Sequence, residues 1–119
     1  NDLSFMQFGE IYFSWVFPDA IKAWKLHKEI ICNFAIPYGS IKMVLYDERE
    51  GSETNGQVNE IILGEQEYHL LTVPNNIWYG FVSSTNTPSL VANCATLPHS
   101  AEEVRNREYN DPRIPYKWN

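Results

Sequence analysis

The chain has 119 residues, of which 44% are hydrophobic and 14% aromatic, and nine basic against fifteen acidic residues give a net charge of −6. This length fits one domain, residues 1–119, and the apolar content is too high for a disordered chain. The acidic balance argues against a general nucleic-acid partner. No apolar run is long enough to cross a membrane, so no membrane association is expected. Because the chain begins at Asn1 without a methionine, part of the native N-terminus is expected to be missing.

Short segments in which apolar and polar residues alternate predict β-strands. In chain order they are Glu10–Val16, Ile21–Leu26, Ile30–Ile36, Ile41–Tyr46, Val58–Leu63, Tyr68–Val73, Trp78–Ser83 and Leu90–Cys94. Turn signals such as Asn55-Gly56 and Pro74-Asn75-Asn76 separate them. Eight or so short strands at regular spacing favour a sandwich or a barrel.

The only helical pattern is near the C-terminus. Ser100 and Glu103 have the spacing of a capping box, in which each side chain satisfies a backbone N–H at the start of a helix. We therefore expect Ala101–Arg107 to form a short helical segment, followed by an irregular tail over residues 109–119.

The two cysteines, Cys32 and Cys94, form no C-x-x-C pair. Two free thiols in a cytoplasmic protein are the simpler interpretation, although sequence alone leaves one disulfide bridge open.

His27 is the histidine whose position is most suggestive, because it ends an alternating strand that can face a cavity. A lone strand histidine is more often structural than functional. A first-row metal site of the His-x-His type needs a further imidazole, but Lys25 stands two residues before His27, and Tyr79 stands where another histidine would be expected. We expect no metal and no other cofactor.

Basic residues gather in one part of this acidic chain. They are Lys22, Lys25, Lys28, Lys42 and Arg49. Such a group is usually a solvated face, and a local anion-binding site is the functional alternative.

The order of several short motifs resembles the dTDP-4-dehydrorhamnose 3,5-epimerase family. The motifs are Lys25-Leu26-His27, Gly39, Tyr46-Asp47-Glu48-Arg49, Gly56, Val73 to Phe81, Asn110-Asp111-Pro112 and Trp118. The resemblance covers roughly residues 9–118, and no single motif is decisive. It implies an all-β cupin jelly roll.

The resemblance also implies a reaction, in which a proton next to the 4-keto group of a nucleotide-linked deoxy sugar is removed. A histidine oriented by an aspartate is the base, and a tyrosine on the opposite face of the sugar transfers the second proton. His27 matches the base and Asp111 matches the orienting aspartate. The base must be oriented and the enolate stabilised, because a proton beside a carbonyl is only weakly acidic.

The sequence departs from the family pattern at four places. Trp24 stands in place of an arginine and Cys32 in place of the enolate-stabilising lysine. Tyr79 replaces a histidine, and Asn93 falls near the position of the opposite-face tyrosine.

These departures leave several interpretations open. Tyr79 acts as the acid, or only one centre is inverted, or the protein is a non-catalytic cupin that binds a nucleotide sugar or carbohydrate. An unrelated small ligand is a further alternative. In the first two cases Lys22, Lys25 or Arg49 meets the pyrophosphate, and Trp24, Cys32 and Asn93 lie near the sugar. By analogy with the family we expect a homodimer.

Overall fold

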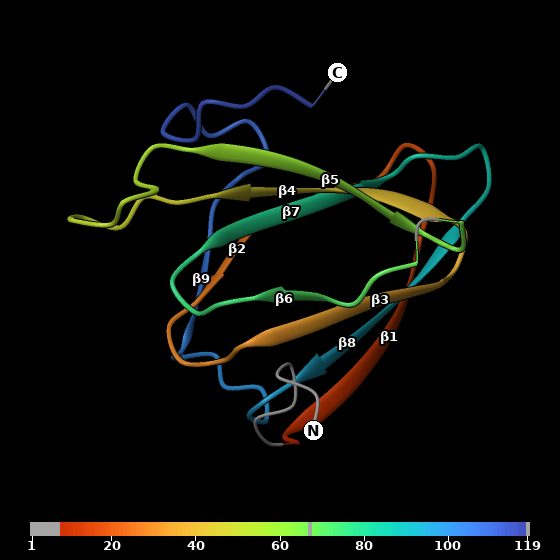
Figure 1. The fold of residues 1–119 in the computed structure, drawn as a ribbon, viewed down its shortest axis with the longest axis horizontal. Helices are drawn as coiled ribbons and strands as arrows, with labels where there is room; N and C mark the ends of the chain where they lie inside the picture. The colour runs from red at the N-terminus through yellow and green to blue at the C-terminus, as the bar shows by residue number, and fades with distance from the viewer. Residues whose placement is uncertain (1–7, 67, 119) are drawn as a thin grey trace.

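The computed structural model describes residues 8–66 and 68–118, which contain nine β-strands (Figure 1). They are β1 (Glu10–Val16), β2 (Ile21–His27), β3 (Cys32–Tyr38), β4 (Ser40–Tyr46), β5 (Val58–Gly64), β6 (Leu71–Val73), β7 (Trp78–Ser83), β8 (Ser89–Ala95) and β9 (Val104–Asn106).

The strands form two antiparallel sheets that face each other (Figure 1). The four-stranded sheet has the order β1-β8-β3-β6, and the five-stranded sheet has the order β5-β4-β7-β2-β9. Apolar side chains from the inner faces, such as Phe34, Met43, Phe81 and Val91, form the core between the sheets. Two facing sheets with crossing connections make the expected jelly roll.

All eight predicted strands are present. Glu10–Val16 and Trp78–Ser83 have the predicted bounds, whereas β6 starts only at Leu71. Strand alternation is a local pattern of period two, so it is readable without knowing the partners of each strand.

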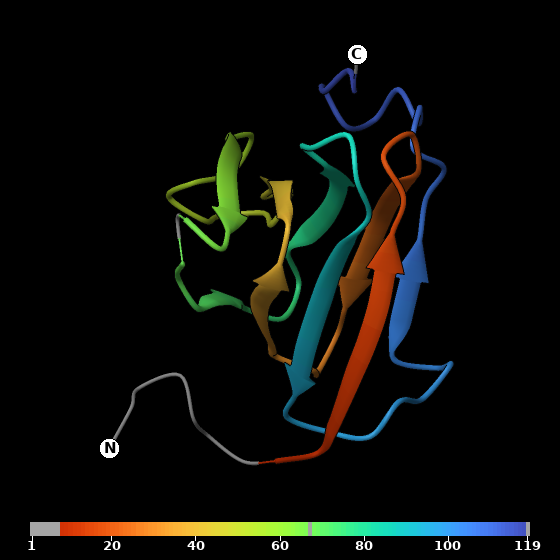
Figure 2. The same cartoon turned by 90° about the vertical axis from the view of Figure 1, so that its right-hand side faces the viewer.

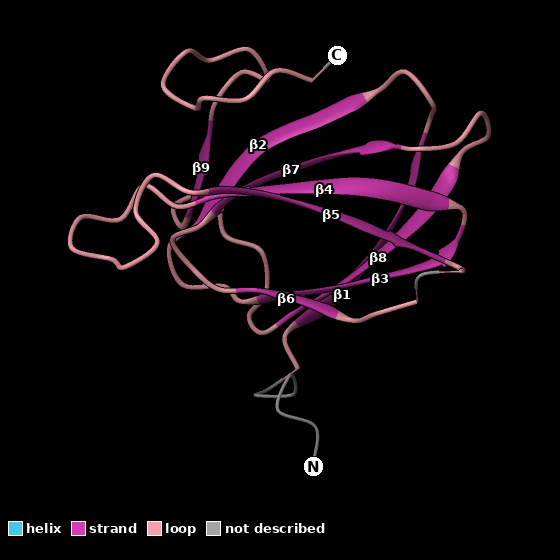
Figure 3. Ribbon diagram, turned by 45° about the horizontal axis from the view of Figure 1, so that its top comes forward, coloured by secondary structure: helices cyan, strands magenta, loops and turns pink. Residues whose placement is uncertain are grey.

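The predicted C-terminal helix over Ala101–Arg107 is wrong. Residues 101–103 form a turn, β9 follows, and no helix occurs in residues 8–66 and 68–118 (Figure 3). The Glu103 side chain accepts hydrogen bonds from the backbone N–H groups of Glu29 and Ile30, far away in the sequence. Pairing of β9 with β2 and this long-range contact override the local helical pattern.

A second apolar cluster lies on the outer face of the five-stranded sheet, where the chain after β9 covers it (Figure 1). Trp24 is buried there, 5.1 Å from the ring of Trp118, and donates its indole N–H to the carbonyl of Tyr109 at 3.2 Å. Strand β2 therefore has a covered outer face, while its inner face is turned toward the space between the sheets.

The loop between β4 and β5 is held by the buried carboxylate of Asp47. This carboxylate accepts hydrogen bonds from the backbone N–H and the guanidinium of Arg49, and from the hydroxyls of Ser52 and Thr54. The Arg49 side chain and these other donors hold the pKa of Asp47 well below its usual range, against the opposing effect of burial. The Asp47–Arg49 pair is therefore part of the loop structure.

We predict that Asp47→Ala destabilises the protein by about 2–3 kcal/mol, because several donors lose a charged acceptor. Urea unfolding at pH 7 measures this change. The control is Glu53→Ala, an exposed carboxylate in the same loop. Equal unfolding midpoints for the two variants would show that the Asp47 network contributes nothing.

Candidate active site

A cavity of about 1150 Å³ opens between the two sheets. Lys25, His27 and Tyr79 reach it from the five-stranded sheet, and Tyr12, Cys32 and Asn93 from the four-stranded sheet. Most of the polar side chains expected near the sugar therefore come together in one place.

His27 is held at both ring nitrogens. Its Nδ1 lies 2.7 Å from Oε2 of Glu103, and its Nε2 lies 3.2 Å from the hydroxyl of Tyr79. The Tyr79 ring stacks on the imidazole at 5.9 Å. Since a carboxylate only accepts, Nδ1 carries the hydrogen in this contact, and the Nε2 of a neutral ring accepts from Tyr79. Nε2 is thus the nitrogen that can take a proton.

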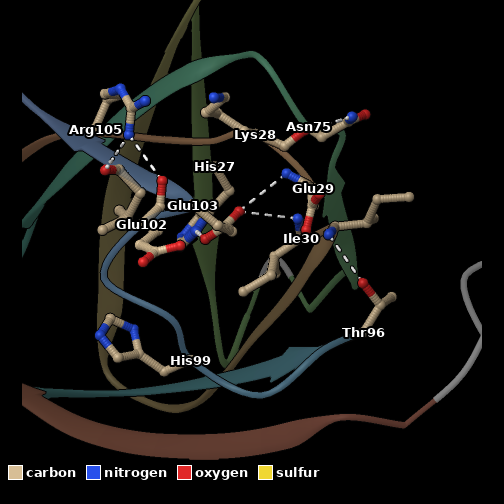
Figure 4. A network of polar contacts seen from close by, with 12 residues as sticks. His27, Lys28, Glu29, Ile30, Asn75, Thr96, His99, Glu102, Glu103 and Arg105 are labelled. Carbon is tan, nitrogen blue, oxygen red and sulfur yellow. Dashed lines mark hydrogen bonds and ion pairs between the residues drawn. The ribbon is translucent and has the colours of Figure 1, made fainter.

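Glu103 connects His27 to the backbone at the end of β2. Its Oε1 accepts hydrogen bonds from the N–H groups of Glu29 and Ile30, each at 3.0 Å (Figure 4). Burial alone would raise the pKa of Glu103, but the hydrogen bonds from His27 and from these two N–H groups outweigh it and lower the pKa. A buried, ionised carboxylate beside Nδ1 stabilises the imidazolium that forms when Nε2 is protonated.

Tyr79 and Cys32 both line the cavity, and the ring of Phe34 packs against Tyr79. Burial, with a smaller contribution from Cys32, raises the pKa of the Tyr79 phenol, and burial raises the pKa of the Cys32 thiol to about 11. Both groups therefore keep their protons at neutral pH. Oδ1 of Asn93 is buried and has no hydrogen-bond partner within the protein, which makes it an unsatisfied acceptor in the cavity wall.

Asp111 does not orient His27, contrary to expectation. Its carboxylate lies 2.6 Å from Nη2 of Arg113 and also accepts the backbone N–H of that residue. These contacts with Arg113 lower the pKa of Asp111 to about 2. Asp111 lines the cavity, but the carboxylate that contacts the imidazole is that of Glu103.

Of the three basic residues that the sequence offered for the pyrophosphate, Arg49 lies outside the cavity. Its guanidinium is bound by Asp47. Lys22 and Lys25 do line it. Trp24 contributes to the lining as well, although most of its ring is buried under the C-terminal tail.

Arg107 is a cavity residue that sequence reasoning missed. Its guanidinium makes two hydrogen bonds to the carboxylate of Glu48, at 2.8 and 2.9 Å, and lies 4.2 Å from the ring centre of Trp78. Glu103 and Tyr12 were missed too. No local pattern marked Arg107 as a cavity residue, and nothing local connected Glu103 to His27.

Within residues 8–66 and 68–118, no group of three or more histidine, cysteine, aspartate or glutamate side chains is placed to hold a metal ion.

We predict that Glu103→Ala destabilises the protein by about 3 kcal/mol, because it leaves His27 and the N–H groups of Glu29 and Ile30 without their acceptor. Glu103→Gln should recover most of this loss, since its carbonyl oxygen can still accept from Glu29 and Ile30. Chemical denaturation measures both variants, with the exposed neighbour Glu102→Ala as the control. If Glu103→Ala unfolded at the same denaturant concentration as Glu102→Ala, the contacts of Glu103 with His27, Glu29 and Ile30 would not stabilise the fold.

The chain as a whole is similar to known proteins. The chain is 45% identical to a dTDP sugar isomerase from Desulfovibrio desulfuricans G20, whose crystal structure superposes with a TM-score of 0.96 over 99% of this chain and 76% of that one. A dTDP-4-dehydrorhamnose 3,5-epimerase from Bacillus anthracis, with TDP and pyrophosphate bound, shares the fold at 22% identity (TM-score 0.84, 94% of this chain and 66% of that one).

The third is a curated relative, Agl13 of Haloferax volcanii, described as a probable low-salt glycan biosynthesis epimerase. It is 35% identical over 106 residues, which are 88% of this chain. The chain spans 65% of the length of Agl13. The sequence profile of the dTDP-4-dehydrorhamnose 3,5-epimerase family matches residues 32–119. The chain therefore belongs to the dTDP-4-dehydrorhamnose 3,5-epimerase family.

Proposed function

We propose that the protein is an epimerase or isomerase of a nucleoside-diphosphate-linked 4-keto-6-deoxy sugar, which works by removing a proton next to the ketone. The observation that carries the proposal is the arrangement of His27, whose Nδ1 is held by a buried carboxylate while Nε2 faces the cavity beside Tyr79. This is the arrangement that a general base needs.

In the proposed step, Nε2 of His27 takes the proton from the carbon beside the ketone, and the electrons of the C–H bond move onto the ketone oxygen. Glu103 stabilises the resulting imidazolium. Tyr79, displaced from Nε2 by the sugar, donates a hydrogen bond to the sugar from the same side of the cavity as His27. Lys25 on the same strand supplies positive charge for the enolate oxygen.

Positive charge near the cavity favours a diphosphate as part of the ligand. Lys22, Lys25, Arg107 and Arg113 all line the cavity, and guanidinium groups bind phosphate oxygens with good geometry. The relative from Bacillus anthracis contains TDP and pyrophosphate. We propose that Lys22, Arg107 and Arg113 hold the diphosphate, while Cys32 and Asn93 lie near the sugar. Trp24, which the sequence placed near the sugar, is instead buried on the outer face of the sheet.

The biological setting follows from the same proposal. The description of Agl13 as a glycan biosynthesis epimerase supports a role in polysaccharide or deoxy-sugar synthesis. We place this role in the cytoplasm, where nucleotide-activated sugars are assembled and where free thiols such as those of Cys32 and Cys94 persist. No helix in the described part of the chain has the length and apolarity needed to span a membrane.

Solvent deuterium exchange into dTDP-4-keto-6-deoxyglucose, followed by NMR, tests the proposed function. We predict that the wild-type protein introduces deuterium beside the ketone and that His27→Ala slows this exchange at least 100-fold, the usual minimum for loss of a general base. His69→Ala, an exposed histidine in a loop, is the control. Binding of the sugar nucleotide without exchange would mean that the protein is a binder, and unchanged exchange in His27→Ala would mean that the base is elsewhere.

We further propose that the protein is a homodimer that covers the outer face of β1. Ile11, Phe13 and Trp15 alternate along this strand with the cavity-facing residues and are all exposed, as is Phe17 just beyond it. Strand β1 is also an edge of its sheet (Figure 2). An exposed apolar row on an edge strand is a surface that a partner normally covers.

A charged residue in the apolar row of Ile11, Phe13 and Trp15 should separate the subunits. Twofold symmetry places two copies of the charge at the interface, where they would be buried and would repel each other. We predict that wild-type protein sediments as a dimer and that Phe13→Lys sediments at half that mass. Tyr68→Lys is the matched control, since Tyr68 is equally exposed (61% against 62%) in the loop between β5 and β6. A wild-type monomer, or a Phe13→Lys dimer, would contradict the proposal.

A further inference from the structure

Inversion of a carbon centre needs two protons to move on opposite faces. One group removes a proton from one face of the sugar, and another group delivers a proton to the other face. His27 and Tyr79 cannot divide this work between them, because their rings stack on each other and both belong to the five-stranded sheet. A second group on the opposite side of the cavity is therefore needed, and the four-stranded sheet lies on that side.

The four-stranded sheet offers few polar side chains that face His27 across the cavity. They are Glu10, Tyr12, Ser14, Cys32 and Asn93. The amide of Asn93 is not an acid, and the hydroxyl of Ser14 is too weak an acid. Glu10 is ionised at neutral pH, because its hydrogen bond from Tyr12 lowers its pKa. The Cys32 thiol is only 1% exposed, so water cannot easily restore a proton that it has given away.

We propose that Tyr12 is the catalytic acid that delivers the proton to the face of the sugar opposite His27, an inference that rests on the proposed function. Tyr12 on β1 pairs directly with Asn93 on β8, so their side chains point the same way from the sheet. Its hydroxyl donates a hydrogen bond to Glu10 at 2.6 Å. The phenol thus stands beside Asn93, on the cavity face of the neighbouring strand.

The state of the Tyr12 phenol suits this role. Burial, together with the hydrogen bond to Glu10, raises the pKa of Tyr12 to about 12, so the acid is protonated at neutral pH. The residue is nevertheless 40% exposed, so water can reach the oxygen after the proton has left. Tyr12 is therefore in contact with both the cavity and the solvent, whereas Tyr79 and Cys32 are in contact with the cavity alone.

The proton balance of the step is complete. His27 breaks a C–H bond on one face, and the electron pair moves onto the ketone oxygen. When the enolate collapses, its electrons form a new C–H bond with the proton of Tyr12 on the other face, and the O–H electrons remain on the phenolate oxygen. Water returns a proton to Tyr12, and His27 releases its proton to water.

Tyr12→Phe in deuterium oxide tests this inference with dTDP-4-keto-6-deoxyglucose. We predict that the variant still exchanges the proton removed by His27, within about threefold of wild type, but forms inverted product at least 100-fold more slowly. Recovered sugar should then carry deuterium in its original configuration, because His27 returns deuterium to the face from which it removed the proton. A merely structural role would lower exchange and inversion together.

Tyr68→Phe is the matched control, since it removes one phenolic hydroxyl from an exposed loop outside the cavity. Inversion by Tyr12→Phe at the wild-type rate would overturn the role of Tyr12 and leave the proposed function intact. Wild-type protein that exchanges without inverting would overturn the role of Tyr12 as well. Wild-type protein that does not exchange at all would overturn both the role of Tyr12 and the proposed function.

Discussion

The carboxylate of Glu103 is the contact on which the arrangement of the site depends. It joins the imidazole of His27 to the backbone N–H groups of Glu29 and Ile30, where the chain leaves β2 for β3. A buried carboxylate is tolerable only when such donors surround it. The same interaction therefore fixes the turn, selects the tautomer of His27 and orients Nε2 toward the cavity.

The rest of the fold supports this contact from both sides of β2. Strand β9 pairs with the end of β2 and places Glu103, which immediately precedes it, next to His27. The tail after β9 covers the outer face of the sheet and buries Trp24. A side chain on a strand that is packed in this way has little freedom, which is what a precisely placed base requires.

The strands, and a sandwich or barrel, were predictable from the sequence because alternation and turn residues are local signals, whereas the jelly roll was implied by the family resemblance. His27 was predictable as a candidate from its place at a strand end. Its partner was not, because Glu103 lies 76 residues away and the local pattern around it resembles a helix start. Asp111 was assigned through family resemblance, but Arg113, two residues further on, takes its carboxylate. Pairings of this kind are decided by competition between charged neighbours, which the order of residues alone does not show.

The two faces of the seven-residue strand β1 have different roles. Its odd-numbered positions Ile11, Phe13 and Trp15 are apolar and face outward, and Tyr12 and Ser14 face the cavity. A shift of one residue in its pairing with β8 would turn the aromatic row into the cavity and the hydroxyls out to solvent. Insertions or deletions of a single residue within β1 are therefore excluded for a functional protein, whereas a change of residue type on one face leaves the other face free to vary.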